Sequence, residues 1–166
     1  MSVRVQPLST HLIEVRLRPE FTDAEGAAAL ALLHAQGQTS LREVRVSRLY
    51  EISGPVSATQ AQQTAKELLS DAVTQEHRML APVSAPMNGM NFWRVEVWLK
   101  PTVSDPAGDT VREAMADAGL PRPDAVRTAL AYRLSGRSSR PALEKAVWRA
   151  LANPLIHRVV VSEAHP

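Results

Sequence analysis

The chain has 166 residues, 45% of them hydrophobic and 22% charged, which is the balance of an ordinary folded protein rather than of a disordered segment. It contains no cysteine, so disulfide frameworks, thiolate metal sites and thiol nucleophiles are excluded, and its longest apolar run, residues 27–33, is too short to cross a bilayer. Nineteen lysines and arginines nearly balance seventeen acidic residues, so charge alone does not argue for a nucleic-acid partner, and an N-terminus without an apolar stretch favours a cytoplasmic protein.

The first predicted elements are a strand and a helix. Alternation predicts a strand that stops at Pro19; its expected inward residues are Ile13, Val15 and Leu17, and its outward residues are Glu14 and Arg16. The helix begins at Asp23, whose carboxylate can accept hydrogen bonds from the amides of the first turn, and it ends at Gly37. The expected buried stripe of this helix is Ala29, Leu32 and Leu33.

A second strand follows, and it exceeds the usual strand length of about 5 to 6 residues. Its expected inward residues are Val44, Val46, Tyr50 and Ile52. Ser57 caps a second helix, and residues 73–80 supply a less regular last strand. A three-stranded sheet with two helices on one side leaves its other face and its edges uncovered.

The same order returns in the second half of the chain at a constant offset of 82 residues, the difference between the paired Val15 and Val97. This offset pairs identical residues without a gap: Asp23 with Asp105, Gly26 with Gly108, Gly37 with Gly119, Tyr50 with Tyr132 and Ser57 with Ser139. In the second copy, Pro106 suits the first helical position, where no amide partner is needed, and Asn153-Pro154 ends the last helix. The expected stripe of its first helix is Val111, Ala114 and Met115.

Between the copies, residues 81–91 contain prolines and a glycine that oppose regular structure. We therefore expect a first repeat at 1–82, a linker at 83–92 and a second repeat at 93–166. The predicted fold class is α+β: two ferredoxin-like β-α-β-α-β units in tandem, with antiparallel sheets, which cover each other as a pseudo-dimer. The overlong middle strand is the element expected to extend from one copy to the other. The chain is expected to be a monomeric pseudo-dimer or a weak homo-oligomer.

Two motifs distinguish the second copy, Asp105-Pro-Ala-Gly108 at its first helix and Leu151-Ala-Asn-Pro154 before its last strand. In this order, and after the strand end Trp98-Leu-Lys-Pro101, they resemble the PurS family, the small subunit of phosphoribosylformylglycinamidine synthase. The resemblance spans nearly all of residues 93–162. Residues 12–80 resemble a more divergent member, which keeps Asp23-Ala-Glu-Gly26 and has no Asn-Pro.

The resemblance implies a non-catalytic assembly subunit in de novo purine biosynthesis. Such a subunit bridges a glutaminase (PurQ-type) and an ATP-dependent synthetase (PurL-type), so that ammonia from glutamine reaches the amidation site of this carbon–nitrogen ligase. No catalytic residue, cofactor or metal is expected on this chain, and ATP, Mg and glutamine would be used by the complex.

Candidate partner-interface residues also come from the family pattern. Members carry Arg-x-Gly-Lys in the middle strand, where this chain has Arg45-Val-Ser-Arg48 and Arg127-Thr-Ala-Leu130. The resemblance thus implies that replacing Arg45 and Arg48 weakens complex formation more than replacing Arg127. The other candidates are the aromatic residues Trp98, Tyr50 and Tyr132.

The sequence also contains features that suggest other sites and functions. A basic cluster, Arg133, Arg137, Arg140, Lys145 and Arg149, is expected to be a solvated face or a patch for an acidic protein. An RNA site is disfavoured because base stacking would have only Trp98 and Tyr132 available. The histidines lack metal-ligand spacing, and capping explains Asp23 and Asp105 better than catalysis does. The rival function is a tandem small-molecule-sensing (ACT-like) pair that binds a ligand between its copies.

Overall fold

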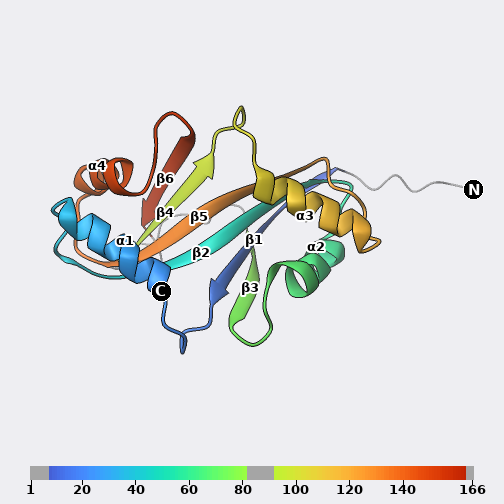
Figure 1. Ribbon diagram of the computed structural model, residues 1–166, viewed down its shortest axis with the longest axis horizontal. Helices are drawn as coiled ribbons and strands as arrows, with labels where there is room; N and C mark the ends of the chain where they lie inside the picture. The colour runs from blue at the N-terminus through green and yellow to red at the C-terminus, as the bar shows by residue number, and fades with distance from the viewer. Residues whose placement is uncertain (1–7, 82–91, 164–166) are drawn as a thin grey trace, which may run out of the picture. The chain divides into compact units, whose positions relative to one another are not determined.

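The computed structural model describes residues 8–81 and 92–163, and their six strands form one sheet in the order β3-β1-β2-β5-β4-β6 (Figure 1). The first copy supplies β1 (Ser9–Leu17), α1 (Ala24–Ala35), β2 (Leu41–Gly54), α2 (Ala58–Thr64), the short π-helical segment η1 (Ala65–Leu69) and β3 (Gln75–Leu80). The second copy supplies β4 (Phe92–Leu99), α3 (Pro106–Asp117), β5 (Ala125–Gly136), α4 (Arg140–Ala150) and β6 (His157–Glu163). The predicted order of strand, helix, strand, helix, strand is confirmed in both copies, and the predicted linker lies outside the described residues except for Phe92.

The described residues form two compact units, and each unit contains elements of both copies. Unit 1 comprises residues 8–18, 48–81 and 104–128, and unit 2 comprises residues 19–47, 92–103 and 129–163. Unit 1 therefore combines β1, α2, η1 and β3 of the first copy with α3 of the second, whereas unit 2 combines β4, α4 and β6 of the second copy with α1 of the first. The long strands β2 and β5 contribute residues to both units. This agrees with the prediction that the overlong middle strand extends beyond its own copy.

In unit 1, helices from the two copies close one core. The last strand of the first copy, β3, is regular rather than irregular, and it pairs antiparallel with β1, with Ile13 opposite Met79 and Val15 opposite His77. The buried residues of this core are Ile13, Val15, Ile52, Val56, Ala61, Ala65, Met115 and Val126. Met115 of α3 is fully buried. A helix of the second copy therefore completes a core that the first copy mostly builds.

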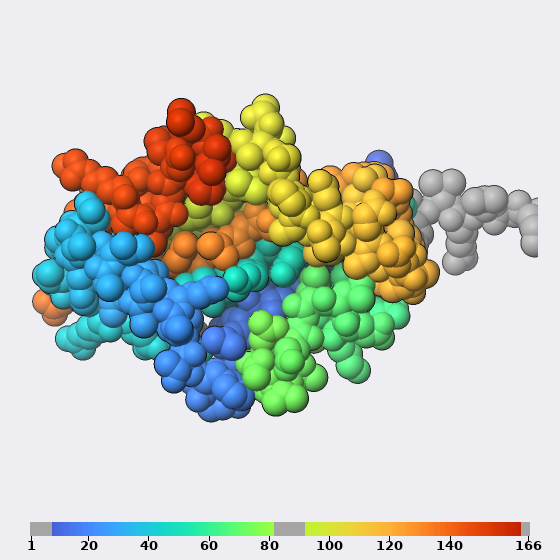
Figure 2. Space-filling view, viewed as in Figure 1, coloured from blue at the N-terminus to red at the C-terminus, as the bar shows by residue number. Residues whose placement is uncertain are grey.

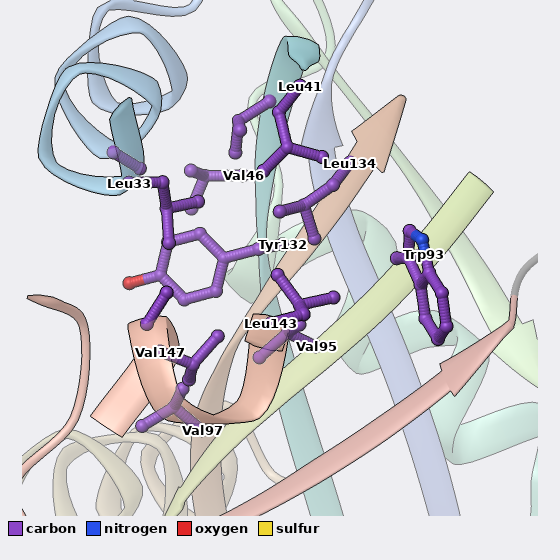
Figure 3. Packing of buried hydrophobic residues seen from close by; sticks show 13 residues of the cluster. Leu33, Leu41, Val46, Trp93, Val95, Val97, Tyr132, Leu134, Leu143 and Val147 are labelled. Atoms are coloured by element: carbon purple, nitrogen blue, oxygen red, sulfur yellow. The ribbon is translucent and has the colours of Figure 1, made fainter. Parts of the chain in front are cut away.

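Unit 2 has the reciprocal composition. β4 pairs antiparallel with both β5 and β6, and α1 and α4 lie against each other in this unit (Figure 2). The buried residues of its core are Ala29, Leu33, Leu41, Val44, Val46, Trp93, Val95, Val97, Tyr132, Leu134, Leu143, Ala146 and Val147. Figure 3 shows Leu33 of α1 and Val147 of α4 gathered with Tyr132 of β5. Here a helix of the first copy completes a core that the second copy mostly builds.

The helix ends follow the predicted signals. The Ser57 hydroxyl accepts a hydrogen bond from the Gln60 amide at 3.1 Å, and Gln60 Oε1 accepts one from the Ser57 amide at 2.9 Å, which is a complete capping box. Gly37 follows α1 with a φ of 87° and Gly119 follows α3 with a φ of 78°, the left-handed conformation that glycine adopts at low cost. None of the helices within the described ranges is long and apolar enough to span a membrane.

The predicted stripe of α1 is partly wrong. Ala29 and Leu33 lie one turn apart and are buried, but Leu32 is 50% exposed. Neighbouring helical residues point in directions about 100° apart, so a single stripe that contains Leu33 and Ala29 turns Leu32 toward solvent. In α3, Met115 is buried, and Val111 and Ala114 are only partly so.

Glu14 also departs from its predicted environment. It lies on the opposite face of β1 from Ile13 and Val15, as alternation predicts, yet it is only 3% exposed. Arg78 stands directly opposite on β3 and donates to Glu14 Oε2 at 2.6 Å, so a cross-strand ion pair covers the carboxylate.

The adjacent leucines of α1 provide a matched test of this packing. Leu33→Ala should lower the free energy of unfolding by about 2 to 5 kcal/mol, because it opens a cavity in the core of unit 2. Leu32→Ala should change it by no more than about 0.5 kcal/mol, because that side chain is half exposed. Urea denaturation of both variants measures the difference, and equal losses would contradict the assignment of Leu33 to the core.

Candidate functional site

Asp23 joins the start of α1 to the middle of β2 within unit 2. Its Oδ1 accepts a hydrogen bond from the Gly26 amide at 2.8 Å, which is the predicted helix cap. Its Oδ2 accepts a second hydrogen bond, from the Val46 amide on β2, at 2.7 Å. The side chain is buried, so one carboxylate satisfies a helix terminus and a strand amide at the same time.

Asp105 makes the same connection between α3 and β5 within unit 1. It accepts from the Gly108 amide at 2.9 Å and from the Thr128 amide at 2.7 Å. The Thr128 hydroxyl adds a third donor, 2.9 Å from Asp105 Oδ1. The two amide donors lie 82 residues beyond their counterparts in the first copy, so the repeat extends to individual hydrogen bonds, and the Thr128 hydroxyl is an addition of the second copy.

The glycines of both motifs allow the helix to approach the strand this closely. A Cβ atom on Gly26 would lie 2.0 Å from the carbonyl oxygen of Val44, and one on Gly108 would lie 2.0 Å from that of Val126. Any side chain would therefore push the helix away from the strand. We refer to Asp23 with Gly26, and to Asp105 with Gly108, as the two aspartate joints.

The turn before the last strand of the second copy is stabilised by three hydrogen bonds between side chains and backbone groups. Asn153 Oδ1 accepts from the Leu155 amide at 2.9 Å, and the Asn153 amide donates to His157 Nδ1 at 2.9 Å. Lys100 Nζ donates to the carbonyl of Pro154 at 2.6 Å. The motif Asn153-Pro154 thus forms an Asx turn whose backbone is fixed from several sides.

The first copy builds the same turn from different residues. Asp71 Oδ1 accepts from the Val73 amide at 2.7 Å, and the Asp71 amide donates to Gln75 Oε1 at 2.9 Å. Arg18 Nη2 donates to the carbonyl of Ala72 at 3.1 Å. Each of these residues lies 82 positions before its counterpart, so the loss of Asn-Pro from the first copy did not remove the Asx turn.

The arginines expected to contact a partner lie in different surroundings. Arg45 belongs to unit 2, is half-buried and donates from Nη1 to the carbonyl of Phe21 at 3.0 Å. Arg48 belongs to unit 1 and is exposed, and its odd spacing from Arg45 places the two on opposite faces of β2. Arg127 is half-buried in unit 1. Burial raises the pKa of the Tyr50 phenol, and the positive charge of Arg48 partly opposes this shift.

Two of the candidate aromatic residues are engaged within the chain. Tyr132 is buried in the core of unit 2. Trp98 is only 5% exposed, its Nε1 donates to Glu96 Oε2 at 2.9 Å, and the Arg158 guanidinium carbon lies 5.7 Å from its ring centroid. A contact between these rings and a partner stays a prediction, as it does for the arginines.

The predicted basic cluster does not share one environment. The guanidinium of Arg133 lies 4.6 Å from the ring centroid of Phe92, and Arg140 Nη1 donates to the carbonyl of Val161 at 2.5 Å. The remaining members, Arg137, Lys145 and Arg149, are exposed. Within residues 8–81 and 92–163, no three histidine, aspartate or glutamate side chains are grouped so that they could hold a metal ion.

Comparison of the chain with known protein families shows which family it belongs to. The family model described as PurS, phosphoribosylformylglycinamidine (FGAM) synthase, matches residues 10–81 and again residues 93–164, which together are more than half of the chain. The chain belongs to the PurS family. PurS membership confirms the resemblance seen in both copies and indicates a role in FGAM synthase, in purine biosynthesis, together with other subunits of that enzyme. None of the curated proteins matches the chain.

Sequence reasoning found the PurS motifs but missed part of what they do. The cap that Asp23 forms was predicted, whereas its bond to Val46 was not, because a strand amide far along the chain carries no mark in the sequence. The Asx turn at Asp71 was also missed. The constant offset could have found it, since it pairs Asp71 with Asn153, and both residue types favour such turns.

Removing one aspartate joint should destabilise this PurS protein. Asp105→Ala leaves the amides of buried Gly108 and half-buried Thr128 without their acceptor, and we expect a loss of about 2 to 4 kcal/mol in unfolding free energy. Asp109→Ala, an exposed change in the first turn of the same helix, should cost less than about 1 kcal/mol. Thermal and urea unfolding compare the two variants, and similar losses would argue against the joint.

The Asx turn of the first copy should respond to acid. Hydrogen bonds from the amides of Thr74 and Val73 hold the pKa of the Asp71 carboxyl below its ordinary value. The stabilisation is therefore complete above that ordinary value and is lost as the pH falls through the lowered pKa. Asp71→Asn should keep the turn, as Asn153 does in the second copy, and remove this dependence on pH.

An NMR titration of the Asp71 carboxyl carbon checks this shift, and the Asp71→Asn spectrum assigns the resonance. Titration of Asp71 at or above the ordinary value would show that the carboxylate does not accept these amide bonds in solution.

Proposed function

We propose that this PurS chain is the assembly subunit of FGAM synthase, which joins a glutaminase (PurQ-type) subunit to an ATP-dependent synthetase (PurL-type) subunit. The observation that carries the proposal is the double family match, over residues 10–81 and 93–164, on a chain whose two copies complete each other's cores. Ammonia released from glutamine then passes to the amidation site without leaving the complex.

The use of the motif residues supports a role in assembly. The buried aspartates of both joints accept backbone hydrogen bonds from a helix and a strand, so their carboxylates serve the architecture of this chain. ATP, Mg and glutamine are assigned to the partner subunits, and the contribution of this chain is to position those subunits relative to one another.

Duplication on one polypeptide also suits a bridge between two different partners. The two copies have diverged on the sheet face opposite the helices. In unit 1, Arg16 on β1 forms an ion pair with Glu76 on β3 at 2.6 Å, whereas the equivalent pair in unit 2 is Trp98 with Arg158. A homodimer would present two identical surfaces, but this chain presents two related surfaces with different chemistry.

Reconstitution tests the proposal directly. The chain is added to separately purified synthetase-type and glutaminase-type subunits, and glutamine-dependent amidine formation is measured together with the mass of the complex. We expect activity with glutamine to rise at least about tenfold on addition of the chain, because the chain brings the two active sites together. Ammonium chloride in place of glutamine should support the synthetase without the chain, since free ammonia needs no transfer.

The same assay separates this proposal from the sensing alternative. A chain that leaves both activities unchanged, and that binds an amino acid or a nucleotide tightly on its own by calorimetry, would be a ligand-sensing module instead. The roles of Arg45, Arg48 and Arg127 can be compared in the same mixture by the mass of the complex that each variant forms.

A further inference from the structure

The tips of the two Asx turns carry exposed aliphatic side chains. Leu155 is 80% exposed and Val73 is 74% exposed. They are equivalent residues of the repeat, 82 positions apart, and each directly follows the residue whose carbonyl is held by Lys100 or Arg18. An exposed aliphatic residue at one loop tip is ordinary, but the same feature at the same place in both copies requires a reason.

The backbone of each tip is fixed before any partner arrives. The Leu155 amide is held by Asn153 Oδ1 at 2.9 Å, and the Val73 amide is held by Asp71 Oδ1 at 2.7 Å. A residue presented on a rigid turn loses little conformational entropy when it binds, which is the property of a good interface anchor. The turns therefore present these aliphatic side chains in a defined direction.

The two copies have kept this turn while changing the residues that make it. Asp71 corresponds to Asn153, Gln75 to His157 and Arg18 to Lys100, yet each pair makes the same hydrogen bond. Elsewhere the equivalent side chains changed their interactions, as the ion pair of Arg16 with Glu76 shows against Trp98 with Arg158. Packing within the chain does not require an aliphatic tip, because both tips point mostly into solvent.

We propose that the two Asx-turn tips are the anchors by which this chain binds its partner subunits, each inserting an aliphatic side chain into an apolar pocket of a protein. The Leu155 tip is the larger, since Pro154 and Ile156 beside it are also exposed. Lys100 lies against the Leu155 turn and Arg158 follows it directly, so the matching pocket carries acidic residues at its rim. The inference rests on the proposed function, because it names the surface through which assembly occurs.

The Val73 tip is expected to fit a different pocket. Its turn contains the anionic Asp71, with Arg18 on its carbonyl, so the charges beside it nearly cancel. A valine also offers less apolar area than a leucine flanked by an isoleucine. The stronger anchor therefore lies in unit 2 and the weaker one in unit 1.

Exposed aliphatic residues, two within the turns and one outside them, provide the test. Binding of wild type, Leu155→Ser, Val73→Ser and the control Leu32→Ser to the purified synthetase-type and glutaminase-type subunits is measured by calorimetry. We expect Leu155→Ser to weaken binding to one subunit by at least about tenfold, Val73→Ser to weaken binding less, and Leu32→Ser to leave it unchanged. Melting temperatures equal to wild type show that the turn variants stay folded, as their exposure predicts.

The outcomes separate the two proposals. Wild-type affinity in both turn variants, with clear binding of wild type, would overturn the anchors and leave the assembly role intact. Absence of binding by wild type itself would overturn the assembly role and the anchors with it. Sedimentation of the chain alone tests whether the tip binds a second copy of the chain instead. A homo-oligomer that dissociates in the Leu155→Ser variant would overturn the assignment of the tip to a partner subunit.

Discussion

Asp23 and Asp105 each hold a helix against a strand through hydrogen bonds to backbone amides, and the internal packing of each compact unit depends on its own contact. The strand in question is the long one, β2 or β5, which contributes to both units. Because the joint lies on the part of β2 that belongs to unit 2, α1 is fixed among elements of the second copy. The reciprocal joint fixes α3 among elements of the first, so neither core is complete with one copy alone.

Much of this could be predicted from the sequence, because local signals have local causes. Alternating residues predict the strands, Asp23 and Ser57 mark helix starts, and Gly37 and Gly119 mark helix ends. The overlong middle strand pointed to an element shared between the copies. The sequence did not show which copy's strands a helix covers, since the stripe of Leu33 is equally apolar against either copy.

Errors of detail have the same origin. Leu32 and Leu33 cannot be told apart by hydrophobicity, and only the direction in which α1 faces its core decides which one is buried. Glu14 was expected to face solvent, but the antiparallel register sets Arg78 across from it. Tyr132 and Trp98 were predicted at a partner interface, and that prediction stays open although both rings also pack within the chain; the exposure of Leu155 has no counterpart among the sequence predictions.

Both copies thus use their motif aspartates within the architecture and present a hydrogen-bonded turn tip at the surface, which is consistent with the proposed assembly role. The exchange of helices between copies is the claim on which this account depends, and methyl and aromatic NOEs in the intact chain test it most directly. The account predicts NOEs from Leu33 to Tyr132 or Val147, and from Met115 to Ile13 or Ile52. NOEs from Leu33 that connect it only to residues of the first copy, and from Met115 only to residues of the second, would contradict it.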